Sequence, residues 1–384
     1  MTVSSLPQPA DVRFEILGDS GQLRAASERW LEREVIALDT EFVRERTFFP
    51  ALGLLQIASG NEVFLVDPLA IDDFGPLIEV LEAASVLKIL HSGSEDLEVL
   101  GLEFDALPHP LFDTQTAAAL VGRGYSPGYA RLIDDLFGLT IPKGETRSNW
   151  LRRPLRPAQL HYAALDVAYL IPAYRQLAGE LEQHGRTEWM VEEGRRQLEN
   201  ASTFPEDEDL YLKIGRARHM SRVQLAALRE LVAWREREAR KRDLPRNFVI
   251  REPALIALAL QRPRSFSRLR EVDGVDPKVA ERHGRALLQV IRDAASLPAN
   301  ERPEHLPRVT DLSQHKHAVS RLRAAVQQVA DELNLAPELL ASKRTVEELK
   351  RRSLDGARPL LPGPMRGWRS EVLSPRLLPL LGES

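Results

Sequence analysis

Three short runs of valine, isoleucine and leucine lie close together near the start of the chain, at residues 35–39, 52–57 and 63–67. Turn-forming residues separate them, among them Pro50 and Gly60. Runs of this length and composition, broken by turns, are typical of strands joined in an antiparallel meander. A chain with this beginning must build at least one sheet.

Helical and strand patterns alternate after the meander. The spacing of apolar residues predicts a helix over 74–84, a strand over 86–91 and another helix from about residue 94. Helical spacing dominates beyond that point. This mixture predicts an α/β domain over residues 1–200, with a mixed central sheet flanked by helices.

Two polar, proline-bearing stretches divide the remainder of the chain, at 199–209 and 297–307. Helical apolar spacing between them predicts a small all-helical domain over residues 210–296. A third, also helical, domain is expected over 314–384. Because proline interrupts helices, we expect only short ones at its end, which contains Pro359, Pro362, Pro364 and Pro375.

Composition limits the kinds of partner and of metal ligand that the chain can have. The absence of cysteine excludes disulfides and thiolate sites, so any metal must take oxygen or imidazole ligands. The net charge is −4, yet residues 211–298 hold 20 Lys and Arg against 10 Asp and Glu. This asymmetry suggests an anionic partner, with solvated helix faces as the alternative. No leader or membrane-length apolar run is visible, so we expect a cytoplasmic protein without membrane contact.

Acidic residues follow two of the expected strands. Asp39 and Glu41 end the first apolar run, and residues two apart on a strand share a face, so both carboxylates can reach one cation while Thr40 points away. Asp96 falls in the first turn of the helix from residue 94, with Glu95 as a competitor facing another direction. The alternatives are a solvated turn for the pair and a favourable helix-dipole contact for Asp96.

A fourth acid, Asp166, lies in an expected helix that places Tyr162 on the same face, four residues earlier. The alternative is a core tyrosine with a convenient acceptor. Four carboxylates brought together repel one another unless cations neutralise them. Two Mg²⁺ or Mn²⁺ ions roughly 3.5–4 Å apart could then activate a water and stabilise the leaving 3′ oxygen of a phosphodiester.

The order of these motifs resembles the three exonuclease motifs of the DEDD superfamily, and within it the ribonuclease D family. The resemblance covers residues 14–185. The three motifs are Asp-Thr-Glu-Phe at 39–42, His-Ser-Gly-Ser-Glu-Asp-Leu-Glu at 91–98 and Tyr-Ala-Ala-Leu-Asp at 162–166. Two segments between them also match, Phe-Asp-Thr-Gln at 112–115 and Lys-Gly-Glu-Thr-Arg-Ser-Asn-Trp at 143–150. It implies a ribonuclease H-like fold and metal-dependent 3′–5′ hydrolysis of RNA, for example tRNA precursors and other 3′-extended RNAs.

Carried over by position, the resemblance makes Asp39, Glu41, Asp96 and Asp166 metal ligands and catalytic residues, with Tyr162 orienting the attacking water. Because a tyrosine pKa near 10 makes it a poor base, activation should come mainly from the metal.

A second branch of the superfamily has histidine five residues before the last aspartate, a spacing that His161 meets. Five helical residues turn through about 500°, which leaves His161 roughly 140° from the direction of Asp166. Tyr162 is about 40° away. The sequence therefore favours tyrosine.

Further residues near these motifs are candidates for contacting the substrate, with ordinary packing as the alternative for the aromatic ones. The candidates are Thr40, Phe42, His91, Lys143, Arg147 and Trp150.

The helical region resembles the helicase-and-RNase-D C-terminal (HRDC) domain, on the segments 231–249 and 255–260 and on Leu-Arg-Glu-Val-Asp-Gly-Val at 269–275. Residues 314–384 resemble a second, more divergent copy with a weaker basic character. Candidates for phosphate contacts in the first copy are Arg235, Arg240, Lys241, Arg242 and Arg246.

The leading hypothesis is a 3′–5′ exoribonuclease, and two rivals remain. One is a DNA exonuclease, although neither a helicase motif nor a phosphate-binding loop is visible. The other is a non-catalytic RNA-binding scaffold, although all four carboxylates are present. We expect a monomer, because the two helical domains of one chain can already hold the bound partner together.

Overall fold

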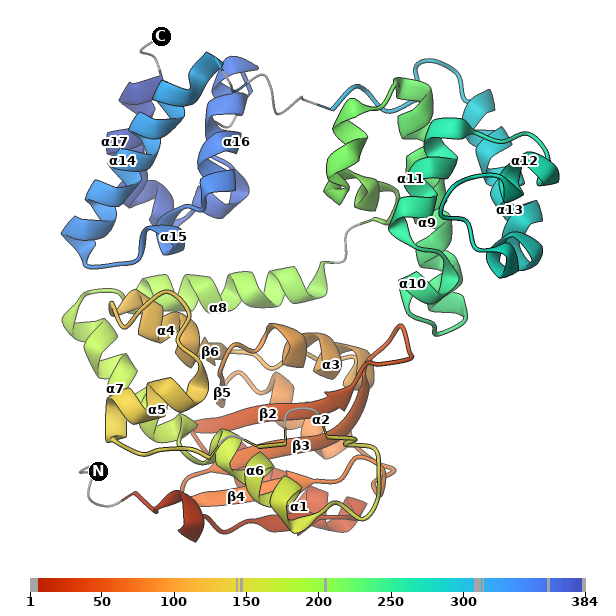
Figure 1. Ribbon diagram of the computed structural model, residues 1–384. Coiled ribbons are helices and arrows are strands. Elements are labelled where there is room, and N and C mark those ends of the chain that lie inside the picture. The colour runs from red at the N-terminus through yellow and green to blue at the C-terminus, as the bar shows by residue number, and fades with distance from the viewer. Residues whose placement is uncertain are drawn as a thin grey trace. The chain divides into compact units, whose positions relative to one another are not determined.

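The computed structural model describes residues 6–142, 144–145, 148–203, 206–306, 312, 314–357 and 360–381. The chain forms two compact units. Unit 1 comprises Met1–Val43, Ala51–Thr203 and His315–Ser384, and unit 2 comprises Arg44–Pro50 and Phe204–Gln314 (Figure 1). None of the described helices is both long and apolar enough to cross a bilayer.

A six-stranded mixed sheet is the centre of unit 1, with the strand order β1-β4-β3-β2-β5-β6. The expected meander is confirmed, since β2 pairs antiparallel with β3, and β3 antiparallel with β4. The other three pairings are parallel. The strands are β1 (Glu15–Leu17), β2 (Val35–Val43), β3 (Ala51–Ser59), β4 (Glu62–Val66), β5 (Leu87–Leu90) and β6 (Leu111–Asp113).

A separate hydrophobic core lies on each face of this sheet. One face packs against α1 (Ser20–Leu31), α2 (Gly75–Glu82) and α3 (Ser94–Phe104). The other face packs against the helices that follow in sequence, which are α4 (Thr114–Leu120), α5 (Tyr129–Phe137), α6 (Pro157–Ala168) and α7 (Leu170–Gln183). The sheet is therefore flanked by helices on both sides, which confirms the expected α/β architecture.

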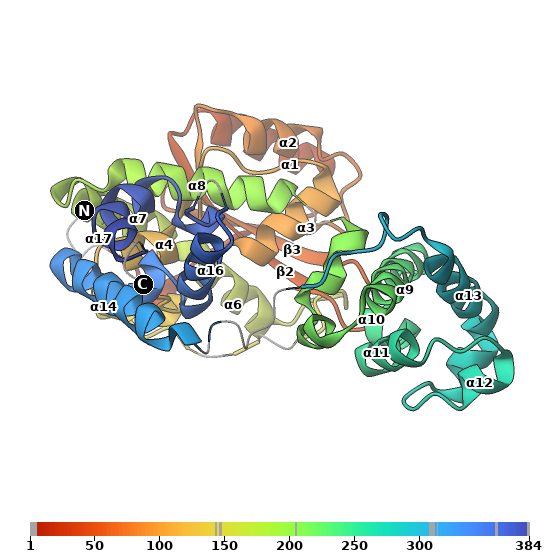
Figure 2. The same cartoon turned by 90° about the horizontal axis from the view of Figure 1, so that it is seen from above.

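The C-terminal helices belong to unit 1, and their apolar side chains join the same core as α4 to α7. Helix α8 (Thr187–Ser202) lies between them and the rest of the unit (Figures 1 and 2). Trp189 on α8 stacks on Trp368, with ring centroids 4.3 Å apart. The C-terminal helices are α14 (Lys316–Leu333), α15 (Pro337–Leu340), α16 (Lys343–Leu354) and α17 (Trp368–Leu381).

Unit 2 is helical, as expected for residues 210–296. After two 3₁₀ segments, Asp207–Lys213 and Gly215–His219, it contains five α-helices around its own core. The unit also includes the turn between β2 and β3, where the backbone N–H groups of Phe48 and Phe49 donate to Asp243. The helices are α9 (Arg222–Lys241), α10 (Arg246–Val249), α11 (Glu252–Gln261), α12 (Phe266–Arg270) and α13 (Pro277–Ser296).

Two details differ from the sequence predictions. The edge strands β1 and β6 were not expected, because each is three residues long and pairs with strands distant in the sequence. The expectation of only short helices near the C-terminus was wrong, since α17 runs through Pro375 and Pro379 for 14 residues. Its buried face, which includes Leu373 and Leu377, anchors it to the core and offsets the lost backbone hydrogen bonds.

Candidate functional site

Strand β2 brings two carboxylates to one face of the sheet. Asp39 and Glu41 lie two residues apart on this strand, before a register shift in the pairing with β3 at Glu41/Phe42. One ligand atom from each of Asp39, Glu41 and Asp166 can be chosen so that the three lie within 4.8 Å of one another. Strand and helix therefore supply one group of converging oxygen donors.

Asp96 joins this region from the first turn of α3. Its Oδ1 accepts a hydrogen bond from the Thr40 backbone N–H at 3.1 Å and another from the Thr40 hydroxyl. Since Thr40 lies between Asp39 and Glu41, these bonds attach Asp96 to the same stretch of β2. Asp96 is 8% exposed, whereas the neighbouring Glu95 is exposed to solvent. The structure thus brings Asp96, and not Glu95, to the cluster.

Helix α6 carries the fourth carboxylate and the tyrosine. The helix begins at Pro157, after a capping box between Arg156 and Gln159. One turn apart on it, the Tyr162 hydroxyl donates to the Asp166 carboxylate. Burial and the nearby carboxylates raise the pKa of Tyr162, so its hydroxyl keeps its proton. Tyr162 is therefore a hydrogen-bond donor here and not a base.

The electrostatics of the four acids indicate a cation site. Burial, followed by repulsion from Asp166 and Asp96, raises the pKa of Glu41 to about 9. Burial is also the main cause that raises the pKa of Asp166 to about 7 and of Asp96 to about 6. The pKa of Asp39 lies well above its usual range because of burial and its three acidic neighbours. Closely placed divalent cations would remove this repulsion.

The donor set also fits such ions. Mg²⁺ and Mn²⁺ are hard cations that prefer oxygen ligands, and carboxylate oxygens converge here from β2 and α6. Asp96 of α3 lies outside this group of three but near enough to repel Asp39 and Glu41. The chain contains no thiol that could compete for a softer metal. The acidic cluster therefore supports the use of a divalent metal.

His91 lies next to the acidic cluster in a polar network that holds α4 and α5. Its Nδ1 is 2.9 Å from the Thr114 hydroxyl, and its ring packs edge-on against Tyr129 at 5.6 Å. Burial lowers the pKa of His91, although Asp113 opposes this, so the ring is neutral at pH 7. Its Nε2 is buried and has no hydrogen-bond partner among the described residues, which leaves one polar atom for a ligand.

Gln56 is a polar residue that the sequence analysis passed over. It pairs with Asp39 across the β2–β3 ladder, so the two side chains share a face of the sheet. The side chain is 0% exposed, and neither its amide nitrogen nor its oxygen has a partner within the described structure. An amide inside an otherwise apolar strand, Ala51–Ser59, was the available sequence signal.

The remaining predicted substrate contacts have different positions. Trp150 is 1% exposed, and Gly53 lies so close that a Cβ there would come within 2.6 Å of the Trp150 Cβ. This indole is a core residue with no free face for a base, which corrects the expectation of stacking. Phe42 is half-buried and packs against the core beneath β2. Lys143 and Arg147 lie outside the described residues.

All four arginines proposed for phosphate contact in unit 2 are already paired. Arg235 is buried beside Glu236 at 3.0 Å and is inaccessible to a phosphate, which corrects that expectation. The other three arginines form ion pairs, Arg240 with Asp207, Arg242 with Glu238 and Arg246 with Glu236. Lys241 is exposed.

Comparison with known protein families divides the chain into three parts. Residues 14–182 match the family model for a 3′–5′ exonuclease, and residues 224–291 match the HRDC domain. Residues 314–377 match the C-terminal HRDC domain of ribonuclease D. The helical modules are therefore HRDC domains, as their sequence suggested.

Curated relatives cover nearly the whole chain. Ribonuclease D of Pseudomonas paraeruginosa is 40% identical over 365 residues, which are 94% of this chain and 95% of the relative. Ribonuclease D of Escherichia coli K12 is 38% identical over 91% of this chain and 93% of its own length. The crystal structure of Escherichia coli RNase D, described as an exoribonuclease involved in structured RNA processing, superposes with a TM-score of 0.91 at 36% identity and covers 97% of this chain and 99% of that one. The chain belongs to the ribonuclease D family.

Proposed function

We propose that the chain shortens RNA from its 3′ end by hydrolysis and releases nucleoside 5′-monophosphates. In each cycle a water oxygen bonds to the terminal phosphorus and the P–O3′ bond breaks. The shortened RNA then keeps a free 3′-hydroxyl. The convergence of carboxylates from β2 and α6, with Asp96 of α3 held beside them by Thr40, is the observation that carries this proposal. This donor set supports the binding of two divalent cations, which hydrolysis of a phosphodiester would use.

In this proposal Asp39, Glu41, Asp96 and Asp166 hold the metals. Bound divalent ions would lower the pKa of the attacking water and stabilise the leaving oxygen. Tyr162 would orient that water from beside Asp166: its single proton is donated to Asp166, and its oxygen can accept a hydrogen bond from the water. Thr40 keeps Asp96 in place, and His91 would contact the terminal nucleotide.

The finer points of substrate and setting rest on the family. We propose 3′-extended structured RNAs, tRNA precursors among them, as substrates, since the Escherichia coli relative is described as acting in structured RNA processing. Residues 1–200 would cut, while 210–296 and 314–384 would act as accessory domains. Mg²⁺ or Mn²⁺ as the metal, a monomeric state and a cytoplasmic location stay predictions.

Labelled oligonucleotides test the proposal directly. Full-length protein is incubated with matched single-stranded RNA and DNA carrying a 5′ label, in Mg²⁺, Mn²⁺ or EDTA. We expect a ladder that shortens from the 3′ end of RNA, with 5′-monophosphates as products and no activity in EDTA. Asp166→Asn should abolish the ladder. Glu95→Gln is the matched control, because it neutralises an exposed carboxylate next to Asp96.

Each rival has its own result in this assay. Preference for DNA over RNA would favour a DNA exonuclease. Release of nothing from either substrate, with both metals, would favour a non-catalytic RNA-binding protein.

A further inference from the structure

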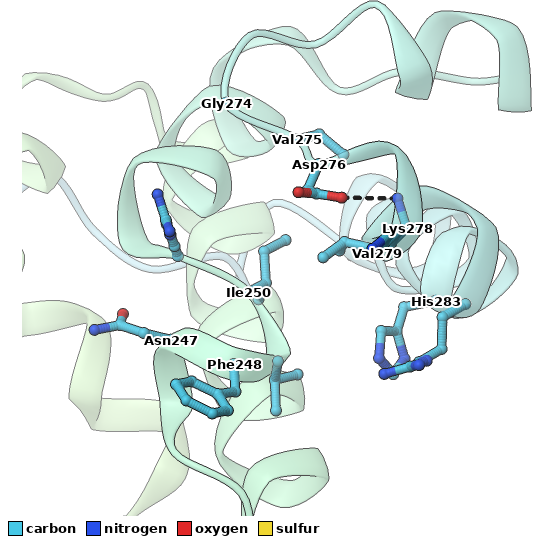
Figure 3. A pocket seen from close by; sticks show the side chains of 12 residues that line it. Asn247, Phe248, Ile250, Gly274, Val275, Asp276, Lys278, Val279 and His283 are labelled. Carbon is cyan, nitrogen blue, oxygen red and sulfur yellow. Dashed lines mark hydrogen bonds between the residues drawn. The ribbon is translucent and has the colours of Figure 1, made fainter. Parts of the chain in front are cut away.

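Unit 2 contains a pocket that is separate from the carboxylate cluster of unit 1. Its volume is about 490 Å³, within the range of clefts that hold small organic ligands. One wall is formed by α10 and the two residues that join it to α11, and the other by the turn at Gly274 and the first turns of α13 (Figure 3). A pocket of this size has room for about one nucleotide.

Three basic side chains of the pocket are exposed and lack a carboxylate partner. Arg251, Lys278 and Arg282 line the pocket, and none of them forms an ion pair among the described residues. Two other exposed arginines of unit 2 are paired, Arg237 with Glu208 and Arg268 with Glu271. Unpaired cations grouped around a hollow are available for an anion.

The pocket has one carboxylate, and that group is engaged locally. Asp276 caps α13, and its Oδ1 accepts a hydrogen bond from the backbone N–H of Lys278 at 2.8 Å (Figure 3). The pocket therefore keeps an excess of positive charge. A phosphodiester fits this charge pattern, and phosphate contacts from Arg and Lys supply most of the non-specific affinity for nucleic acids.

An exposed aromatic ring lies beside these cations. Phe248 is 59% exposed and lines the same pocket, with the Asn247 side chain next to it (Figure 3). Single exposed apolar side chains are common on protein surfaces, so the position of this ring in the pocket, beside the unpaired cations, is the observation that counts. Aromatic rings next to basic side chains are the usual platform on which single-stranded bases stack.

We propose that this pocket binds a nucleotide of a single-stranded RNA segment, with the base on Phe248 and the flanking phosphates on Arg251, Lys278 and Arg282. The inference deepens the proposed function, on which it rests, by assigning a second RNA contact outside the hydrolytic site. An acidic peptide would suit the cations but would leave the exposed phenylalanine and the adjacent amide unused, so the observations favour RNA.

The test measures RNA affinity of the full chain without hydrolysis. A fluorescein-labelled 12-nucleotide oligo(U) is titrated in EDTA, with anisotropy as the readout, at several KCl concentrations. The R251A/K278A/R282A variant should bind at least tenfold more weakly, and its salt slope should fall by roughly 0.7 for each phosphate contact removed. Phe248→Ala should weaken binding at least about fivefold with an unchanged salt slope.

The matched control removes the same number of positive charges elsewhere on unit 2. R237A/R268A/R292A changes three exposed arginines whose side chains already contact Glu208, Glu271 and Gln289. We expect a much smaller loss of affinity than for the pocket variant. Equal losses for the two triple variants would overturn the pocket and leave only a diffuse effect of charge.

Two further measurements separate this inference from its rivals. A labelled twelve-residue polyglutamate is titrated in parallel; if the pocket variants lose the peptide but keep oligo(U), the pocket serves an acidic protein partner and the inference fails. Hydrolysis of a dinucleotide by the unmodified chain in Mn²⁺ tests the proposed function on its own. If the unmodified chain hydrolyses the dinucleotide but the pocket variants bind oligo(U) with unchanged affinity, only the pocket inference fails. If the unmodified chain shows no hydrolysis but the pocket variants bind oligo(U) more weakly, only the proposed nuclease function fails.

Discussion

Thr40 donates two hydrogen bonds to a single oxygen of Asp96, one from its backbone N–H and one from its hydroxyl. The two residues are 56 positions apart, and the bonds join the strand that carries Asp39 and Glu41 to the helix that carries Asp96. Both bonds lower the pKa of Asp96, against the larger effect of burial, which raises it to about 6. Thr40 therefore helps to keep the Asp96 carboxylate ionised and in a fixed orientation.

Thr40→Val should weaken metal binding without unfolding the chain. The variant keeps the shape and the backbone N–H of Thr40 but loses the hydroxyl, so Asp96 becomes harder to ionise and less fixed. Outer partners of metal ligands typically contribute about 10- to 100-fold in metal affinity or activity. Calorimetric titration with Mn²⁺ measures the effect, and Thr203→Val, at an exposed helix end, is the control. Unchanged affinity would reduce Thr40 to a packing residue.

Tyr162→Phe should cost far more activity than His161→Ala. Tyr162 donates to Asp166 and its hydroxyl stays protonated, so removing that oxygen takes a positioned donor from the site. Misplacement of reacting groups commonly costs about 10²-fold in rate, and we expect a loss of this order in kcat. His161→Ala should stay within a few-fold of the unmodified chain. Single-turnover degradation of labelled RNA compares the two, and the reverse ranking would assign the histidine as the functional partner.

The metal-free chain should lose stability as the pH rises. A carboxyl whose pKa is raised on folding binds its proton more tightly in the folded state, so its contribution is complete below the unfolded pKa and declines as the pH approaches the raised value. For Glu41 this window runs from 4.5 to about 9. The melting temperature in EDTA should therefore fall across this range through the acidic cluster.

Mn²⁺ should restore that stability, because it binds the folded state with ionised ligands. Glu41→Gln should flatten the pH dependence in EDTA and reduce the gain from Mn²⁺, whereas Glu95→Gln should do neither. A melting temperature that ignores Mn²⁺ at every pH would contradict a cation site.

Glu193→Gln should destabilise the attachment of the C-terminal helices. Burial alone would raise the pKa of Glu193, but Arg369, Arg196 and the Trp368 indole N–H outweigh it, so the pKa lies below its usual value. Removing one partner of a buried ion pair costs about 3–5 kcal/mol, because the other charge stays buried. Urea denaturation measures the loss, with Glu188→Gln, an exposed residue of the same helix, as the control.

The same ion pair predicts sensitivity to acid. A carboxyl with a lowered folded pKa contributes stability above its unfolded value of 4.5, and this contribution disappears as the pH falls through the folded value. The difference in stability between the unmodified chain and Glu193→Gln should therefore shrink below about pH 4.5. A constant difference down to pH 3 would show that Glu193 acts through packing and not through its charge.

Local periodicity was enough to predict the elements that bear the four acids. Alternation on a strand places Asp39 and Glu41 on one face, and helical spacing places Tyr162 beside Asp166; both relations depend only on neighbours in the sequence. The resemblance to a known family then supplied what periodicity cannot, namely that segments more than 50 residues apart meet in one place.

Contacts distant in sequence account for what was missed. Trp150 is enclosed because Gly53, nearly 100 residues earlier, leaves space for it, and no local pattern records that pairing. No local pattern in the sequence indicates that Arg240 forms an ion pair with Asp207, which comes close to it only in the folded chain. The pocket around Phe248 and Lys278 likewise joins segments separated by two helices, α11 and α12, so its residues could not be grouped beforehand.

The stacked indoles of Trp189 and Trp368, with Glu193 and Arg369 beside them, decide how this enzyme can be shortened. A chain ending before residue 314 would retain all four acids. It would also expose Trp189 to water, leave Glu193 without Arg369, and tend to aggregate. The C-terminal helices α14 to α17 are a structural part of the nuclease unit and not a removable appendage. Truncations made for crystallisation or expression should therefore retain them.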